Sequence, residues 1–277
     1  MEIGLVVTAA LIGVVEGLTE FLPISSTAHI RISELVLGFR DHGETFTVVI
    51  QLGAILAVVA YYWRRWAALA VGCVRGERAS WRFVLGLALA SLPPAALGLL
   101  LNDWLEQQVF GAYEMAVIAS TMLLGGLAIL AVERWRPPPR HQDAGCLPPL
   151  TCLWIGLLQV LAMIPGVSRS GASIIGAMCV GVERRAATEF SFFLAIPIML
   201  GASGLKLAKH HAAVHGDFAL ALLVGFAVSF VVALAAVHWL LAFVATHTFR
   251  PFAWYRIAVG LLLLGLLALG VLPLRVD

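Results

Sequence analysis

The chain has 277 residues, of which 61% are hydrophobic and only 12% are charged. Because a soluble globular domain carries about 25% charged residues, this composition excludes that class and predicts an integral membrane protein. The net charge of +2 gives no reason to expect a nucleic-acid partner, and the four cysteines lack the spacing of a metal site or a disulfide framework.

Six stretches have the roughly 20 mostly apolar residues that a membrane-spanning helix needs. We predict spans at residues 45–63, 83–102, 114–132, 188–208, 218–240 and 254–272. Four other apolar stretches are shorter, or are interrupted by Gly, Pro and charged residues. We predict that these are half-membrane segments: 3–22, 23–38, 150–164 and 168–182. The expected fold is an all-α polytopic membrane protein with a single membrane domain over residues 1–277.

The loop charges predict an orientation, because Lys and Arg accumulate in short cytoplasmic loops. The connection between the first two spans and the linker over about 133–149 are both basic: Arg64, Arg65, Arg75, Arg78 and Arg82, then Arg134, Arg136 and Arg140. Residues 102–114 hold three acidic residues and no Lys or Arg. We therefore expect the basic loops and 241–253 in the cytoplasm, and 102–114, 209–217 and both termini outside. Lys206 and Lys209 weaken this assignment in the second half.

This orientation predicts an inverted repeat. Residues 3–44 would enter from outside and return there, whereas residues 150–187 would enter from the cytoplasm and return. The two halves would cover about 3–132 and 150–273. In inverted repeats the site usually lies near the midplane, where broken helices meet. Re-entrant backbone must be buried in protein or line a wet cavity, because lipid cannot satisfy its polar groups.

Two interrupted stretches share an order of features. The first reads IGVVEGLTEFLPISSTAH over 12–29, and the second reads IGLLQVLAMIPGVSRSGAS over 155–173. Each opens with Ile-Gly, has Glu or Gln three residues after that Gly, and reaches Pro-x-x-Ser at Pro23 or Pro165. Polar and ionisable groups are costly in hydrocarbon, so their presence here predicts a functional site.

We expect Pro23 and Pro165 to end the incoming half-helices. Ser26 or Thr27, and Ser168 or Ser170, are suitable residues to cap the outgoing helices. Two helix N-termini that face one cavity would bind phosphate, because each exposes free N–H groups and a partial positive charge. The candidate phosphate-binding residues are Ser25, Thr27, Ser168, Arg169, Ser170 and Ser173.

Glu16 and Glu20 are four residues apart and therefore share one face of a helix. Two adjacent carboxylates repel each other unless a cation or a shared proton relieves them. Beside phosphate, a divalent cation such as Mg²⁺ or Ca²⁺ would bridge carboxylate and phosphate oxygens. The alternative is a pair of solvated glutamates near the membrane surface.

Ser26, His29 and Arg169 complete the candidate site. Ser26 and His29 would project to one side of the outgoing helix. Either the serine is a nucleophile that the imidazole activates, or the histidine itself attacks phosphorus or moves a proton. Otherwise His29 is a membrane-interface residue bonded to backbone. The planar guanidinium of Arg169 matches two phosphate oxygens. The alternative is that Arg169 pairs with an acidic group and stabilises the fold. Gln51 either lines the cavity or bonds between helices.

The stretches EGLTEFLPISSTAH (16–29) and PGVSRSGAS (165–173) resemble the two signature regions of the bacterial undecaprenyl-diphosphate phosphatases, the bacitracin-resistance family. Further similarity in ETFTVVIQLGAILAVV (44–59) and ATEFSFFLAIP (187–197) extends over nearly the whole chain. Two positions depart from the family pattern: Ala28 stands where Gly is expected, and Ser173 stands where Thr is common.

The resemblance implies an enzyme of the bacterial inner membrane that converts the C55 isoprenyl diphosphate to the monophosphate and inorganic phosphate. It implies a divalent cation, a catalytic or metal-binding function for Glu16 and Glu20, phosphoryl transfer at Ser26 or His29, and a diphosphate held by Arg169. We favour Ser26 as nucleophile by a narrow margin. The expected partners are the long-chain lipid and the bilayer, with access from the periplasm and a homodimer left open. The alternative function is a lipid-phosphate flippase or transporter that uses the same cavity.

Overall fold

The computed structural model describes residues 3–39, 41, 45–108, 113–209 and 217–274, and for 102–108, 206–209 and 217 it describes the backbone alone. These residues are almost entirely helical, which confirms the all-α prediction. The helices are α1 (Ile3–Thr19), α2 (Ser26–Leu37), α3 (Thr45–Tyr61), α4 (Trp63–Val74), α5 (Arg78–Gln108), α6 (Glu114–Trp135), α7 (Pro149–Gln159), α8 (Arg169–Cys179), α9 (Arg184–Lys209), α10 (Asp217–Thr246) and α11 (Arg250–Ala268). Two short 3₁₀ turns, η2 (Ala144–Cys146) and η3 (Val160–Met163), flank α7.

The long helices have the length and composition of membrane spans. Within the described residues, α5, α6, α9, α10 and α11 are each apolar enough to cross a membrane, and α3 with α4 passes the same test as a pair bent by 72°. All six predicted spans are therefore helical. The last one ends earlier than predicted, at Ala268 instead of 272. Gly270 adopts a left-handed backbone with φ 68°, a conformation that terminates a helix and that glycine accepts without strain.

The prediction of a basic loop between the first two spans is wrong, because α4 occupies most of it. The segment WRRWAALAVGCV is amphipathic: Trp66 and Leu69, three residues apart, pack on the main hydrophobic core, whereas Trp63 and Arg64 are exposed. Arg64 therefore lies on the outer face of α4 and Arg75 at its end, whereas the Arg65 guanidinium lies over the rings of Phe83 and Phe193. Of the predicted outer segments, 102–108 continues helix α5 and 109–112 lies outside the described residues, as does most of 209–217.

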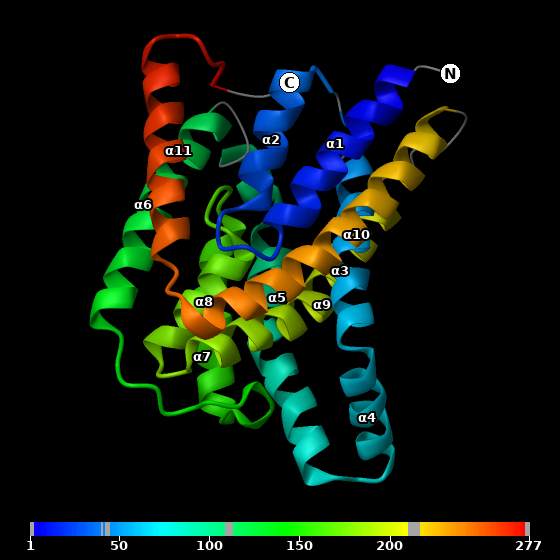
Figure 1. Cartoon of the computed structure of the whole chain (residues 1–277), viewed down its shortest axis with the longest axis vertical. Helices are drawn as coiled ribbons and strands as arrows, with labels where there is room; N and C mark the ends of the chain where they lie inside the picture. The colour runs from blue at the N-terminus through cyan, green and yellow to red at the C-terminus, as the bar shows by residue number, and fades with distance from the viewer. Residues whose placement is uncertain (1–2, 40, 42–44, 109–112, 210–216, 275–277) are drawn as a thin grey trace.

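The two shorter helix pairs occupy opposite parts of the molecule (Figure 1). Both chain ends lie at the top of this view, and α1 descends from there to the middle before α2 returns upward. The linker after α6 lies at the bottom together with α4, and α7 and α8 occupy the lower half. This arrangement is compatible with the predicted inverted repeat and its two re-entrant helix pairs.

The first helix of each shorter pair packs on a long helix of the other predicted half. Helix α1 packs on α10, and α7 packs on α5. The matched glycines of the two Ile-Gly pairs make these contacts possible: a Cβ atom at Gly13 or Gly156 would lie less than 3.0 Å from the carbonyl oxygen of Gly225 or Ala90, respectively. At the end of α1, the ring of Phe21 meets Phe192 of α9 edge to face, with the ring centroids 5.2 Å apart. These contacts fix the two turns that carry the polar residues.

Candidate active site

Two turns bring the polar motifs together. The first connects α1 to α2 through residues 20–25, and the second connects η3 to α8 through residues 164–168. Both incoming helices end before their prolines, α1 at Thr19 and η3 at Met163. The expected helix breaks are confirmed, but both helices end earlier than Pro23 and Pro165. The end of η3 fits the rule that a proline disfavours helix in the residue that precedes it, here Ile164, whereas α1 ends four residues before Pro23.

Ser25 and Ser168 occupy equivalent positions at the starts of α2 and α8. Within the described chain, they are the only non-glycine residues with positive φ, at 74° and 76°. The Ser25 hydroxyl accepts from the Ala28 N–H at 3.4 Å, and the Ser168 hydroxyl accepts from the Gly171 N–H at 3.1 Å. The predicted cap at Ser168 is confirmed, but the cap of α2 is Ser25 rather than Ser26 or Thr27. Such backbone strain, about 1–3 kcal/mol per residue, concentrates at functional sites.

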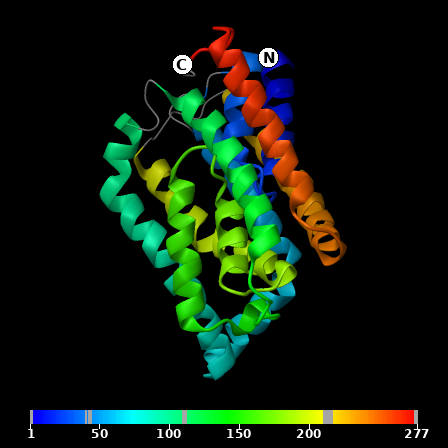
Figure 2. The same cartoon turned by 90° about the vertical axis from the view of Figure 1, so that its left-hand side faces the viewer.

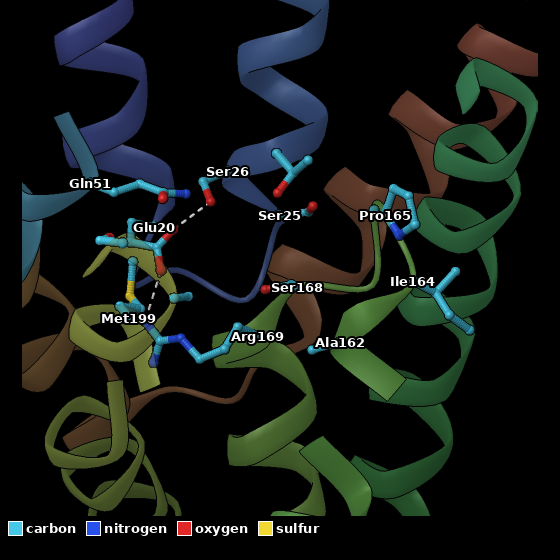
Figure 3. A pocket seen from close by; sticks show the side chains of 14 residues that line it. Glu20, Ser25, Ser26, Gln51, Ala162, Ile164, Pro165, Ser168, Arg169 and Met199 are labelled. Atoms are coloured by element: carbon cyan, nitrogen blue, oxygen red, sulfur yellow. Dashed lines mark hydrogen bonds and ion pairs between the residues drawn. The ribbon is translucent and has the colours of Figure 1, made fainter. Parts of the chain in front are cut away.

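A cavity of about 260 Å³ lies between the two turns (Figure 3). Its walls come from the starts of α2 and α8, from η3 and from the faces of α3 and α9. The residues that line it are Glu20, Ser25, Ser26, Thr27, Gln51, Ala162, Ile164, Pro165, Gly166, Ser168, Arg169, Met199, Ala202 and Ser203. Of the two alternatives for Gln51, the cavity-lining one is confirmed. The cavity joins residues from both sequence motifs.

Glu20 connects the two motifs inside this cavity. Its Oε2 accepts a hydrogen bond from the Ser26 hydroxyl at 2.5 Å, and its Oε1 forms an ion pair with an Arg169 nitrogen at 2.9 Å (Figure 3). Arg169 also donates to the Ser191 carbonyl at 3.0 Å and lies over the Phe21 ring. A carboxylate, a hydroxyl and a guanidinium therefore meet at one point. This geometry suits a nucleophile with a base beside it and a cation for an anionic substrate.

Glu16 lies one turn before Glu20 but does not line the cavity. Its side chain is 0% exposed, and neither carboxylate oxygen has a hydrogen-bond partner within the described residues. An unpaired carboxylate is costly to bury, and a second carboxylate next to it increases that cost. The orphaned oxygens thus fit a bound cation.

The described residues contain no cluster of three or more His, Cys, Asp or Glu side chains suited to a metal. A cation at Glu16 and Glu20 would complete its coordination with substrate phosphate and water. This is a mode that Mg²⁺ commonly adopts, with one or two carboxylates and the substrate's phosphates as ligands. The residues present therefore fit a hard divalent cation that arrives with its substrate.

His29 points toward α11 and is absent from the cavity wall. Its Nδ1 lies 2.6 Å from the Ser25 carbonyl oxygen, and its Nε2 lies 2.6 Å from the Tyr255 hydroxyl. The His29 and Tyr255 rings stack with their centroids 5.6 Å apart. The structure does not bring His29 to the Ser26 hydroxyl, which instead donates to Glu20. Tyr255 was not identified from the sequence.

The predicted phosphate-binding hydroxyls fall into two groups. Ser25, Thr27 and Ser168 line the cavity. Ser170 and Ser173 do not: the Ser170 hydroxyl donates to the Leu22 carbonyl at 2.8 Å, and the Ser173 hydroxyl bonds to that of Ser191 at 2.6 Å. Their contacts hold the turns in place, since Ser170 fastens the start of α8 to the first turn.

Arg256 of α11 is the main residue that the sequence analysis missed. It is 1% exposed and donates only to backbone carbonyl groups, at distances between 2.9 and 3.4 Å. These carbonyls belong to both turns and to α6: Pro23, Gly166, Val167, Thr121 and Met122. One sequence feature could have identified Arg256: it is an Arg within the span predicted over 254–272. A charged residue at that depth in a membrane usually has a function.

Comparisons with known proteins agree with this geometry. The family model described as "Bacitracin resistance protein BacA" matches residues 9–262. An undecaprenyl-diphosphatase of Novosphingobium aromaticivorans is 48% identical over 269 residues, covering 95% of this chain and 98% of the relative. Undecaprenyl-diphosphatase 1 of Agrobacterium fabrum is 45% identical, with 96% and 98% covered, and the Caulobacter sp. enzyme is 45% identical, with 94% and 96% covered. The chain therefore belongs to the BacA bacitracin resistance protein family.

Proposed function

We propose that this multi-pass membrane protein is an undecaprenyl-diphosphatase. It hydrolyses the C55 isoprenyl diphosphate to the monophosphate and inorganic phosphate, and thereby recycles the lipid carrier for cell-wall synthesis and confers bacitracin resistance. The names of the relatives support this function over the flippase alternative. The observation that carries the proposal is the position of Glu20, bonded to Ser26 of its own motif and to Arg169 of the other.

The cavity offers the groups that a diphosphate needs. The N-termini of α2 and α8 adjoin it and carry the partial positive charge of a helix start. Arg169 adds a full positive charge, and the hydroxyls of Ser25, Thr27 and Ser168 add hydrogen-bonding groups. The terminal phosphate would sit among these groups, within reach of Ser26.

The bond between Ser26 and Glu20 supports a double-displacement reaction. The Ser26 Oγ attacks the terminal phosphorus while its proton passes to Glu20 Oε2. The phosphoanhydride bond breaks, and the isoprenyl monophosphate leaves with the bonding electron pair. A water molecule then attacks the phosphoserine, and Glu20, having lost its first proton to solvent, accepts one from that water. The bond between phosphorus and Ser26 Oγ breaks, inorganic phosphate leaves, and the proton on Glu20 passes to Ser26 Oγ, which restores both groups.

Arg169 stabilises the charge on the equatorial phosphate oxygens in the transition state. Its ion pair with Glu20 is the fold-stabilising contact that the sequence analysis gave as the alternative. In this proposal Arg169 both stabilises the fold and binds phosphate. Glu16 and Glu20 would hold a divalent cation, Mg²⁺ or Ca²⁺, which when bound supplies neutralising charge to the phosphate oxygens. Such a cation would also relieve the repulsion between the two carboxylates.

The enzyme acts in the bacterial inner membrane, with its cavity entered from the periplasm. The basic linker and the basic residues of α4 support this orientation, because they lie at the end of the molecule opposite both chain ends (Figure 1). Helices α1 and α2 descend from the end that would face the periplasm.

Phosphate release from undecaprenyl diphosphate by the purified protein tests the function. The wild-type protein should release one phosphate per lipid and leave the monophosphate. A flippase would move the lipid between leaflets of a vesicle and release no phosphate, so this outcome would overturn the proposal.

A further inference from the structure

A second cavity, of about 320 Å³, lies between α5 and α9. The two helices run side by side at one edge of the molecule (Figure 2). The lining residues are mostly small or apolar: Ser91, Pro94, Ala95, Gly98 and Leu99 from α5, and Pro197, Ile198, Gly201, Ala202 and Leu205 from α9. We call this cavity the α5–α9 groove.

The spacing of these residues shows that each helix presents one continuous face to the groove. Along both helices the lining positions recur at intervals of three or four residues, the period of an α-helical face. Small side chains keep the space open. A Cβ atom added at Gly98 or at Gly201 would meet no atom within 4 Å.

The groove adjoins the candidate active site at Ala202, which lines both cavities. On the same helix, Met199 and Ser203 line the active-site cavity, and the Met199 sulfur lies 3.7 Å from an Arg169 nitrogen. Helix α9 thus leads from the guanidinium that would hold the phosphate to an apolar space beside it.

The groove opens toward the surrounding lipid. Leu99 is 69% exposed and Leu205 is 44% exposed, and both belong to helices with the character of membrane spans. In a bilayer an apolar cavity with such an opening is filled by hydrocarbon rather than by water. A chain attached to a diphosphate in the active site would therefore have an apolar route out to the membrane.

We propose that the α5–α9 groove binds the isoprene units nearest the diphosphate of the substrate. This inference rests on the proposed diphosphatase function. The groove has a volume of only about 320 Å³, so it takes the first isoprene units and not the whole C55 chain. The remainder of a C55 chain lies in the bilayer. The groove therefore contacts the chain only at its diphosphate end and leaves total chain length unselected.

A competing apolar cavity, of about 240 Å³, lies beside Arg256. It lies between α6, α7 and α8, with Gly125, Val167 and Ala172 in its wall. It shares no lining residue with the active-site cavity. The α5–α9 groove is thus the better continuation of the site.

Filling the groove tests this proposal by kinetics. The variants Gly98→Leu and Gly201→Leu place side chains in open space within the groove, and Gly265→Leu on α11 makes the same change in open space away from it. We expect KM for farnesyl and undecaprenyl diphosphates to rise about tenfold or more in the two groove variants, because apolar contact is lost. KM for methyl diphosphate, which carries no isoprene unit, should stay within about twofold, and Gly265→Leu should match the wild type. Equal effects on all substrates, or none on the long ones, would overturn the proposal.

A second measurement does not depend on turnover. A farnesyl diphosphate analogue with a diazirine in its first isoprene unit should label residues 91–99 or 197–205, and Gly201→Leu should reduce this labelling while Gly265→Leu leaves it unchanged. Labelling on 125–132 or 171–179 instead would assign the chain to the cavity beside Arg256 and sink the inference. A protein that releases no phosphate yet is labelled in the groove would contradict the enzymatic function and keep the lipid site.

Discussion

Glu20 and Arg169 are 149 positions apart in the chain, yet a carboxylate oxygen of one lies 2.9 Å from a guanidinium nitrogen of the other. Glu20 lies in the turn between α1 and α2, and Arg169 begins α8 directly after the other turn, so their ion pair ties the two turns together within the cavity. Each charge is largely shielded from solvent, and removing one of them would leave the other without its partner. A substrate phosphate would compete with Glu20 for Arg169, which would free the carboxylate to accept the Ser26 proton.

Replacing Glu20 with Gln should lower kcat by about 10²–10⁴-fold, the usual contribution of a general base. The amide keeps the size of the side chain but cannot take the Ser26 proton. Phosphate release from undecaprenyl diphosphate measures the effect. Glu189→Gln is the matched control, because Glu189 pairs with Arg185 at a distance of 3.2 Å outside the active-site cavity. Full activity in Glu20→Gln would exclude Glu20 as the base.

Ser26→Ala should abolish a covalent phosphoenzyme, whereas His29→Ala should retain it. The structure supports this difference, because the Ser26 hydroxyl donates to Glu20 while both His29 ring nitrogens have partners away from the cavity wall. Rapid acid quenching followed by peptide mapping would locate the phosphate. Tyr255→Phe removes only the hydroxyl beside His29 and should leave the phosphoserine yield unchanged. Phosphate mapped to His29 would reject Ser26 as the nucleophile.

Glu16→Gln should raise the concentration of Mg²⁺ or Ca²⁺ that gives half-maximal activity, by about tenfold or more, since one carboxylate ligand is lost. Chelation with EDTA should abolish activity in the wild type, and added cation should restore it. Direct cation titration by calorimetry in the presence of a non-hydrolysable diphosphate separates binding from catalysis. Unchanged cation affinity in the variant would remove Glu16 from the metal site.

Sequence patterns predicted the parts of this fold that depend on local chemistry. Hydropathy located five membrane-capable helices, because burying apolar side chains in lipid requires long uninterrupted runs; the other predicted span coincides with α3, which passes the same test only together with α4. Proline and hydroxyl residues located both turns. The same local signals misplaced the cap of α2 by one residue, since Ser25 and Ser26 are equally suitable types and only the left-handed backbone at Ser25 decides between them.

The remaining features depend on contacts between distant segments, which no local pattern records. Nothing in the first motif indicated that Ser26 would bond to Glu20 rather than face His29. The five carbonyl partners of Arg256 come from three separate elements, so its function as a link emerged only from the folded chain. Ser170 and Ser173 had the right chemistry for phosphate, but tertiary packing directs them to Leu22 and Ser191 instead.

Arg256→Met should lower both stability and activity. The variant keeps an apolar stem of similar length but removes every donor to the two turns, and each buried carbonyl left without a partner costs about 1–3 kcal/mol. We expect a clear fall in Tm in detergent and at least a tenfold loss of kcat. Arg250→Met, an exposed position on the same helix, is the control and should leave Tm unchanged. An Arg256→Met protein with wild-type Tm and kcat would show that the turns hold their positions without this residue.

Thr27→Cys should react with a membrane-impermeant maleimide in intact cells, because Thr27 lines the cavity that we expect to open to the periplasm.

Native Cys146 is the control for the other side of the membrane. It is exposed on the linker expected in the cytoplasm and should be labelled only after lysis. A hydrogen bond with Asp143 raises the pKa of the Cys146 thiol, so less of it is thiolate at neutral pH and its labelling should accelerate as pH rises. Lysed samples at pH 8 therefore set the full signal for Cys146. Replacing Cys73, Cys152 and Cys179 with Ser removes the other native thiols. Labelling of Cys146 but not Thr27→Cys in intact cells would reverse the orientation, whereas the expected pattern places the entrance to the cavity beside α2 on the periplasmic side.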